Sequence, residues 1–210
     1  ASFEKLNSAF CGRTMEARRG NVIVHIPTWL EGRFECTERR SENKMVVTIG
    51  NRSNTYYLFG GRDESSYTLI QGITLAGVLF DEVALMPRSF VEQAMARCSV
   101  SGSKFWFTCN PESPGHWFYK EWICKAAERN MLYLHFTMDD NLSLDEKIKA
   151  RYEGMYSGVF YDRYIRGLWT VAEGLIYTMF TKDYHAVPSV PCDSDEYPLS
   201  CHQAHLKHTP

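Results

Sequence analysis

Several features that would classify this sequence at once are absent from it. Its 210 residues contain no apolar run of about 18 residues, which a membrane-spanning helix needs, and no signal-peptide pattern. The seven cysteines form no CxxC pair, and a chain of this size does not depend on disulfides, so reduced thiols are expected. The net charge of −2 gives no global sign of nucleic-acid binding. We therefore expect a soluble intracellular protein.

A phosphate-binding loop is absent as well. No GxxxxGK[ST] motif occurs, so no loop here can wrap phosphates with backbone N–H groups and a lysine. The segment Gly60-Gly61-Arg62 is no substitute, because it lacks the lysine and the following hydroxyl. The sequence begins at Ala1 inside a predicted helix, and the text after Pro191 has little apolar periodicity. Both ends are expected to be cut or altered.

What is present is the composition and periodicity of an α/β domain. Hydrophobic residues make up 44% and aromatic residues 14% of the chain, which is enough for a substantial core. The pattern predicts strands at 22–26, 45–49, 55–60, 77–80, 104–108 and 131–136, and helices at 3–19, 87–97, 113–126 and 143–156. From about residue 75 strands and helices alternate, which is typical of a central, mostly parallel sheet. Ligands bind such sheets at the carboxyl ends of the strands.

The first candidate site follows the predicted strand 77–80. Four apolar residues lead into Asp81-Glu82, the form of a Walker B motif with a catalytic glutamate. The aspartate can hold Mg²⁺ at the β- and γ-phosphates of ATP, and the glutamate can orient or deprotonate the attacking water. A strand that simply ends in a polar loop gives the same pattern, and the residues alone leave both interpretations open.

The second candidate is Thr108-Cys109-Asn110, which ends the next predicted strand. A hydroxyl and an amide at this position can contact the γ-phosphate or the attacking water. The alternative is a purely structural role, in which Asn110-Pro111 forms a turn before a helix.

With these motifs in place, residues 60 to 180 resemble the ATPase region of phage terminase large subunits. Four sequence segments carry the resemblance, in collinear order: IQGITLAGVLFDEVALMPRSFVEQAMARCS, KFWFTCNPESPGHWFYKEWI, LYLHFTMDDNLSLDEKIKARYEGMYSGVFYDRYIRGLW and AEGLIY. The resemblance implies a P-loop NTPase-like domain that lacks its phosphate-loop segment. It implies that Asp81 is the Mg²⁺ ligand, Glu82 the catalytic base, and Thr108, Cys109 and Asn110 the coupling motif.

The resemblance also implies an organisation and a setting. Residues 1–168 would be an incomplete ATPase domain, 169–191 a linker towards a nuclease domain, and 192–210 an irregular tail. The parent protein would hydrolyse ATP to drive double-stranded DNA into procapsids, and would cut that DNA. Its partners would be DNA, a portal protein, a small terminase subunit and copies of itself in a ring, in the host cytoplasm at the procapsid portal. No nuclease residue is assigned, because the 30 residues after Phe180 are too few for such a domain.

Two alternatives remain for the chain itself. One is a non-catalytic remnant or assembly protein of a decayed prophage, which the missing phosphate loop favours. The other is a helicase-like ATPase, although no further helicase motif occurs. Without its phosphate loop and the strand before it, the isolated chain is expected to hydrolyse ATP poorly and to be weakly stable.

Two further groups are ambiguous. The last predicted helices carry the basic residues Lys147, Lys149, Arg151, Arg163 and Arg166. They suit DNA phosphates or an arginine finger, but nearby acids favour an ordinary solvated helix face. The tail carries Cys192, Cys201, His202, His205 and His208, whose spacing fits no standard zinc site.

Overall fold

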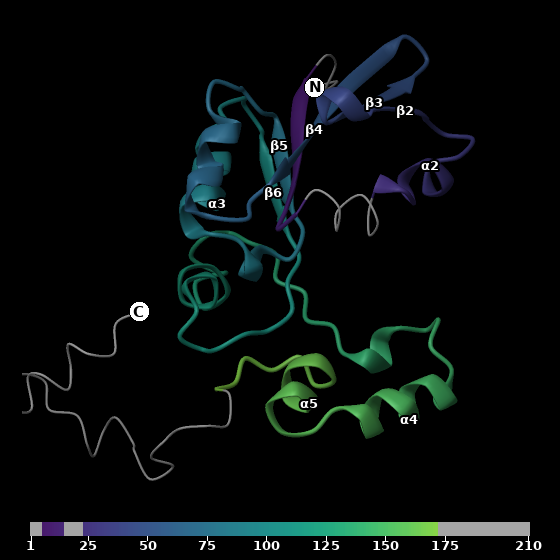
Figure 1. The fold of residues 1–210 in the computed structure, drawn as a ribbon, viewed down its shortest axis with the longest axis vertical. Coiled ribbons are helices and arrows are strands. Elements are labelled where there is room, and N and C mark those ends of the chain that lie inside the picture. The colour runs from purple at the N-terminus through teal and green to yellow at the C-terminus, as the bar shows by residue number, and fades with distance from the viewer. Residues whose placement is uncertain (1–5, 15–22, 172–210) are drawn as a thin grey trace, which may run out of the picture. The chain divides into compact units, whose positions relative to one another are not determined.

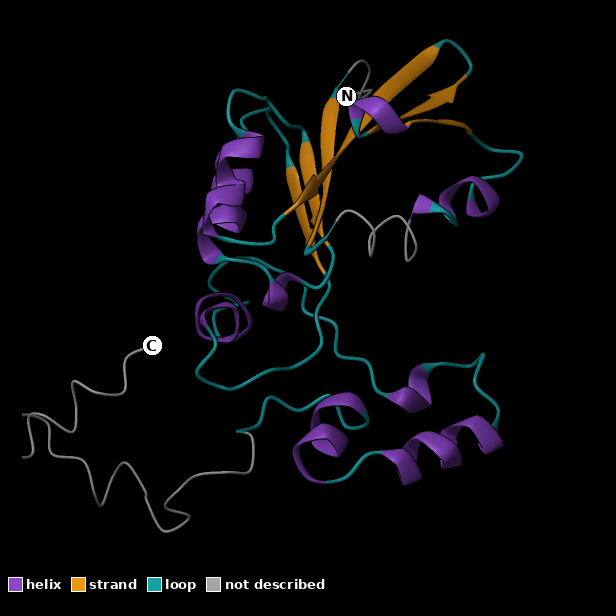
Figure 2. Cartoon of the chain, in the orientation of Figure 1, coloured by secondary structure: helices purple, strands orange, loops and turns teal. Residues whose placement is uncertain are grey.

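A six-stranded sheet forms the centre of the described chain (Figures 1 and 2). The computed structural model describes residues 6–14 and 23–171, which belong to one compact unit. The strands are β1 (Asn7–Gly12), β2 (Glu35–Arg39), β3 (Lys44–Ile49), β4 (Arg52–Gly60), β5 (Gly77–Phe80) and β6 (Lys104–Phe107). The α-helices are α2 (Ile26–Trp29), α3 (Arg88–Ala96), α4 (Glu146–Met155) and α5 (Gly158–Tyr164). Short 3-10 helices are η2 (Arg40–Glu42), η3 (Glu64–Ile70), η4 (Val83–Leu85) and η6 (Met138–Asp140), and η5 (Tyr119–Ile123) is a π-helix.

The order of strands in the sheet is β2-β3-β4-β1-β5-β6. Four neighbouring strands, β4, β1, β5 and β6, run parallel, whereas β2 and β3 extend the sheet as an antiparallel meander. The predicted α/β class with a mostly parallel sheet is therefore confirmed. Because parallel strands end at the same edge, the segments that follow β4, β1, β5 and β6 come together there.

Two apolar clusters fix the sheet between its helices. Ala9 and Cys11 of β1 belong to a cluster that includes α3, whereas Phe10 packs in a second cluster that includes the start of α2. Successive side chains of a strand point to opposite faces, so β1 contributes to both clusters. The first cluster consists of Ala9, Cys11, Ile70, Leu75, Val78, Phe80, Val83, Met86, Phe90, Val91, Ala94 and Phe118. It lies directly beneath the strand ends that carry the candidate site.

The predicted helix at 3–19 is wrong over the residues that the structure describes. Residues 7–12 form β1, which pairs with β4 on one side and β5 on the other. The spacing of Phe3, Leu6 and Phe10 imitates a helical face. The tertiary partners of β1 override that local signal, since only the assembled sheet reveals that this strand is central.

The predicted strand at 22–26 is also wrong where it is described. Ile23 and Ile26 are buried together with Met45 and Leu58, and a turn leads into α2. Two buried residues three apart suit a helical turn, and Pro27 stands at a position that favours a helix start. A run of β-branched residues therefore misled the prediction.

The segment 131–136 forms no strand, contrary to prediction, although its residues suit one. It follows the turn after η5 and lies across a hollow from β6, whose second edge has no strand partner among the described residues. The hollow has a volume of about 1680 Å³ and is lined by both segments. Large apolar side chains are exposed along it, namely Phe105, Trp106, Leu132, Tyr133, Leu134 and Phe136. A strand-prone segment without a neighbouring strand stays irregular, because ladder hydrogen bonds need a partner.

The remaining elements near the site agree with the sequence. The predicted strands at 45–49, 55–60, 77–80 and 104–108 correspond to β3, β4, β5 and β6, and the helix that begins after Pro87 is α3. The helix predicted at 113–126 is reduced to η5 and flanking turns, and α4 begins at Glu146 after the N-cap Asp145. The five cysteines of the described part are all free. No described helix is long and apolar enough to cross a membrane.

Candidate functional site

The predicted acidic pair and the predicted coupling residue meet at the carboxyl end of the sheet. Asp81 follows β5 and Thr108 follows β6, and the parallel register of these two strands places their ends side by side. The Thr108 hydroxyl donates to Oδ1 of Asp81 at 2.9 Å and accepts from the Glu82 N–H at 3.1 Å. One hydroxyl therefore links the three residues.

Thr108 also binds the acidic loop through its backbone. Its N–H donates to the Phe80 carbonyl at 2.9 Å, and its carbonyl accepts from the Val83 N–H at 2.9 Å. On the other side, the Asp81 N–H donates to the Cys11 carbonyl of β1 at 2.8 Å. The acidic loop is thus held by both neighbouring strands and has little freedom to shift.

Glu82 adopts a backbone conformation that is unusual for its type. Its φ of 59° and ψ of 52° lie in the left-handed region. This conformation costs a residue with a Cβ atom about 1 kcal/mol, and it persists only where surrounding contacts enforce it. Two hydrogen bonds supply those contacts. The Glu82 N–H donates to the Thr108 hydroxyl, and the Val83 N–H donates to the Thr108 carbonyl. Strain held in this way at an acidic residue is common at functional sites.

The carboxylate of Glu82 itself is left available. Within the described residues it makes no hydrogen bond or ion pair, and the residue is half-buried. Asp81 is likewise half-buried and uses only Oδ1 for Thr108. The loop therefore presents two carboxylates, one anchored and one uncommitted, a combination that suits a metal ligand next to a general base.

The other two predicted coupling residues differ in character. Burial raises the pKa of the Cys109 thiol to about 11, so the group is neutral near pH 7 and is a poor nucleophile or metal ligand. Asn110 is exposed at the strand end and lines the large hollow together with Thr108 and Cys109. The site residues are thus brought to one place, while their chemical roles remain predictions.

The acids at 139–140 serve local structure rather than the site. Asp140 caps η6 by accepting from the N–H and the hydroxyl of Thr137, and Asp139 lies 3.4 Å from Nζ of Lys149. Bonds to Thr137 lower the pKa of Asp140, which keeps its carboxylate ionised. Capping therefore explains this segment.

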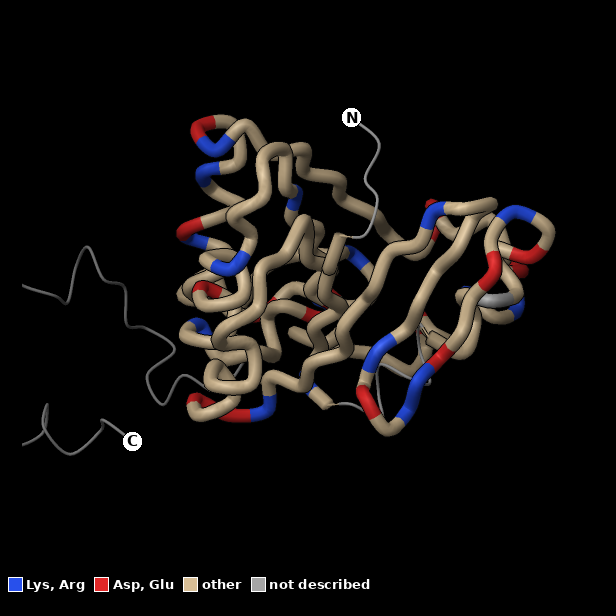
Figure 3. The backbone as a smooth tube through the Cα atoms, turned by 90° about the horizontal axis from the view of Figure 1, so that it is seen from above, with Lys and Arg blue, Asp and Glu red and all other residues tan. Residues whose placement is uncertain are grey.

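The basic run of the last helices is largely neutralised. Arg163 binds Oε2 of Glu112 at 3.0 Å and the Thr170 carbonyl at 2.9 Å, and Arg166 pairs with Asp162 at 3.1 Å. Lys149 pairs with Asp139 and Glu146. Along the described chain basic and acidic residues are interspersed rather than gathered by sign (Figure 3). Arg163, whose side chain is 12% exposed, therefore acts mainly as a structural anchor, whereas Arg166 forms a surface pair.

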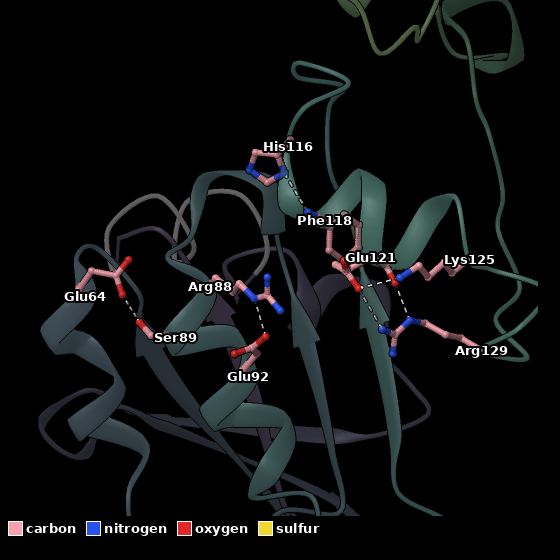
Figure 4. Close-up of polar contacts among 9 residues, drawn as sticks. All are labelled: Glu64, Arg88, Ser89, Glu92, His116, Phe118, Glu121, Lys125 and Arg129. Carbon is pink, nitrogen blue, oxygen red and sulfur yellow. Dashed lines mark hydrogen bonds and ion pairs between the residues drawn. The ribbon is translucent and has the colours of Figure 1, made fainter. Parts of the chain in front are cut away.

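Aromatic side chains of residues 117–122 pack in or against the first apolar cluster. His116 lies close to Trp117 and Trp169, and its Nδ1 accepts from the Phe118 N–H at 3.2 Å (Figure 4). Burial lowers the pKa of His116, so the ring is neutral at pH 7.

Glu121 binds Lys125 and Arg129, and Arg88 of α3 binds Glu92 (Figure 4). These charges are satisfied among themselves.

Sequence reasoning missed a second hollow in the described part of the chain. It has a volume of about 460 Å³ and lies at the ends of β1 and β4, where Arg13 and Arg62 line it. The signal was present as a repeated pattern, since each strand end carries a Gly-Arg pair: Gly12-Arg13 and Gly61-Arg62. Only the pairing of β1 with β4 brings the two patterns together.

No group of three or more His, Cys, Asp or Glu suited to a metal occurs in the described part, and the Cys/His tail lies outside it.

The chain has counterparts among known families and solved structures. Residues 3–181 match the family described as "Terminase large subunit, T4likevirus-type, N-terminal". The chain is similar to the large terminase of a thermophilic bacteriophage in complex with ADP, with 53% identity, a TM-score of 0.79, and coverage of 90% of this chain and 47% of that one. A second crystal form of that phage terminase gives 55% identity, a TM-score of 0.79 and the same coverage. Its complex with ATP-gamma-S gives 53% identity, a TM-score of 0.76, and coverage of 90% and 46%. The chain thus spans about half the length of these structures, and no curated protein matches it.

Proposed function

Because the chain belongs to the family of terminase large subunits, we propose that it forms part of the ATP-hydrolysing domain of a viral DNA-packaging motor. The proposal rests on the hydrogen bonds that the Thr108 hydroxyl forms with the Asp81 carboxylate and the Glu82 N–H. These bonds join the acidic loop to the strand end that would sense the nucleotide. The similar terminase of the thermophilic phage was solved with ADP and with ATP-gamma-S, which supports a nucleotide as the ligand.

In this proposal each residue has a separate task. The oxygens of Asp81 and the hydroxyl of Thr108 are hard donors of the kind that Mg²⁺ prefers. Bound Mg²⁺ would neutralise charge on the β- and γ-phosphates. Glu82 accepts a proton from the attacking water, a task for which its uncommitted carboxylate is suited. Thr108, Cys109 and Asn110 transmit the state of the site into β6, because the Thr108 backbone binds both Phe80 and Val83.

The phosphate contacts must come from elsewhere. The sequence holds no GxxxxGK[ST] loop, and β6 has an edge without a strand partner in the described part. We propose that a further segment of the protein adds a strand between β6 and residues 131–136 and carries the phosphate-binding loop. The hollow of about 1680 Å³ has Thr108, Cys109 and Asn110 in its lining, so such a loop would arrive beside the coupling residues.

Membership of the family supports a proposal for the setting. The intact protein would translocate double-stranded DNA into procapsids and cut it, at the portal in the host cytoplasm. It would work with a portal protein, a small terminase subunit and copies of itself in a ring. Residues 1–168 would belong to the ATPase domain, 169–191 would link it to a nuclease, and 192–210 would form a tail.

The test compares ATP hydrolysis by the 210-residue chain and by a longer protein that includes a phosphate-binding loop. We expect the longer protein to hydrolyse ATP and the shorter chain to remain at background. Glu82→Gln in the longer protein should lower the rate by about 10²-fold or more while nucleotide binding persists. Glu92→Gln is the matched control, since Glu92 pairs with Arg88 on α3.

Two results would contradict the proposal. Equal hydrolysis by the two proteins would mean that no added loop is needed. Unchanged hydrolysis in Glu82→Gln would remove this residue from catalysis and favour a non-catalytic role in assembly.

A further inference from the structure

The hollow lined by Arg13 and Arg62 is built on two strand ends that are hydrogen-bonded to each other. Gly12 of β1 and Gly60 of β4 are partners in the parallel register, and the Gly61 N–H donates to the Gly12 carbonyl at 2.8 Å. Gly61 is buried against Phe90, whose ring would lie 2.5 Å from a Cβ atom at this position. The backbone positions from which Arg13 and Arg62 extend are therefore fixed.

Neither arginine has a counter-charge within the described residues. Arg13 and Arg62 are exposed and make no hydrogen bond or ion pair there. Both line the same hollow. Two guanidinium groups at one site repel each other, and an anion between them relieves that repulsion.

Within the described residues, the carboxylates next to Arg62 in sequence and the one that lines the hollow are engaged elsewhere. Asp63 accepts from the N–H and the hydroxyl of Ser65 at 3.0 and 2.6 Å, which caps η3 and lowers the pKa of its carboxyl group. Glu64 binds the Ser89 hydroxyl of α3 (Figure 4). Glu42, which lines the hollow, binds Lys44 and lies 3.6 Å from Arg39.

The lining of the hollow indicates the class of ligand. Besides the arginines, the lining includes the rings of Tyr57 and Phe59, which stack at 6.2 Å. Guanidinium forks match phosphate oxygens in geometry and charge, and nucleotides commonly present a phosphate next to a flat base. A volume of about 460 Å³ admits a ligand of nucleotide size.

We propose that Arg13 and Arg62 together bind a phosphate group at the ends of β1 and β4, in a site separate from the ATP site at Asp81 and Glu82. The phosphate belongs to a nucleic-acid backbone or to a free nucleotide. Both sources present the same oxygens to the two arginines. The site requires neither a metal nor hydrolysis, so it is tested independently of the ATPase proposal.

The experiment measures binding to the full chain by fluorescence anisotropy. Its probes are a labelled DNA duplex of about 20 base pairs and a labelled ADP, and inorganic phosphate is added as competitor. The variants are Arg13→Gln and Arg62→Gln. Arg52→Gln is the matched control, because Arg52 is an exposed arginine at the start of β4, outside the lining of this hollow. Circular dichroism verifies that every variant is folded.

We expect each arginine variant to lower the affinity for one of the two probes about tenfold, which corresponds to the loss of one charge-assisted hydrogen bond. Arg52→Gln should leave that affinity unchanged. Loss of duplex binding, with a salt slope lowered by about one, assigns the phosphate to DNA. Loss of ADP binding alone assigns it to a nucleotide, provided that the binding persists in a buffer with a chelator and no Mg²⁺. The proposal is overturned if neither probe binds, or if Arg52→Gln weakens binding as much as the two site variants do.

Discussion

The hydroxyl of Thr108 donates to the carboxylate of Asp81 at 2.9 Å, although 27 positions separate the two residues in sequence. This bond connects the two motifs that the sequence indicated separately. It also orients the Asp81 carboxylate, because among the described residues Oδ1 alone is engaged and the second oxygen is left for a ligand. The geometry therefore couples the end of β6 directly to the acidic loop.

Replacing Thr108 with valine tests that coupling. The change keeps the shape but leaves the Glu82 N–H and Asp81 Oδ1 without their partner. We expect the free energy of unfolding to fall by about 1 kcal/mol in urea titrations. Hydrolysis by the longer protein should fall much more, since the acidic loop loses its orientation. Thr108→Ser keeps the hydroxyl and should restore both; equal behaviour of the valine and serine variants would refute the role.

Glycine at position 82 should separate stability from activity. The left-handed φ of 59° strains Glu82, so Glu82→Gly should raise the free energy of unfolding by about 1 kcal/mol while hydrolysis is lost. Asn130, with a φ of 50°, is the control. Asn130→Gly should give a smaller gain, because asparagine tolerates this conformation, and should leave hydrolysis intact. A less stable Glu82→Gly variant would mean that the Glu82 side chain contributes packing that outweighs the strain.

Alanine at position 61 should destabilise the fold. Its Cβ would lie 2.5 Å from the ring of Phe90, which is fully buried. A loss of about 1–3 kcal/mol is expected in denaturant titrations, and Phe90→Leu in the same chain should recover part of it. Gly154→Ala is the control, since nothing lies within 4 Å of its Cβ position in α4. An additive double variant would show that the ring is not the obstacle.

Arg163 should behave as a structural anchor. Its side chain is only 12% exposed, and it binds Glu112, which is 34% exposed. A double-mutant cycle with Arg163→Gln and Glu112→Gln should give a coupling of about 1–2 kcal/mol in the free energy of unfolding. DNA affinity should not change. A coupling near zero together with weaker DNA binding would instead support contact with DNA.

The thiols should differ in reactivity and in their effect on stability. Burial raises the pKa of Cys98 and of Cys109 from 9.0 to about 11, whereas Cys124 is exposed. Iodoacetamide at about pH 8 should therefore modify Cys124 faster than Cys98 or Cys109, as mass spectrometry of peptides would show. If Cys98 or Cys109 reacted as fast as Cys124, their burial would not persist in solution.

The same shifts predict a pH dependence of stability. The neutral thiol is favoured in the folded state, so its stabilising effect is full below pH 9.0 and is lost as the pH rises towards about 11. The thermal midpoint of the unmodified chain in reducing buffer should fall over this window. The double variant Cys98→Ala and Cys109→Ala should show a smaller fall. Parallel curves for the two proteins would assign the fall to other groups.

The site was largely predictable because its signals are local. A buried run that ends in Asp81-Glu82 and a second strand that ends at Thr108 need no knowledge of distant contacts. The parallel class followed from the same alternation of strands and helices. The sequence could not show that the Thr108 hydroxyl forms hydrogen bonds with Asp81 and Glu82, because these bonds depend on the register of β5 and β6.

The failures share one cause, which is dependence on partners far away in sequence. β1 has mostly small or polar residues and a false helical spacing, and its strand character comes from β4 and β5. Residues 131–136 have strand propensity but no pairing partner in the described part. Arg13 and Arg62 become a pair only through the contact of Gly12 with Gly61. Local propensity cannot report such relationships.

The central place of β1 also determines the order in which the chain can fold during synthesis. β1 leaves the ribosome before β4 and β5, so it has no strand partner until residues 55–60 and 78–80 have been translated (Figure 1). The β2–β3–β4 meander pairs between sequence neighbours and can form without waiting for distant segments. Translation adds roughly 5–20 residues per second, so β1 would remain unpaired for seconds. During that interval the nascent chain carries a strand whose backbone is open to chaperones or to other nascent copies.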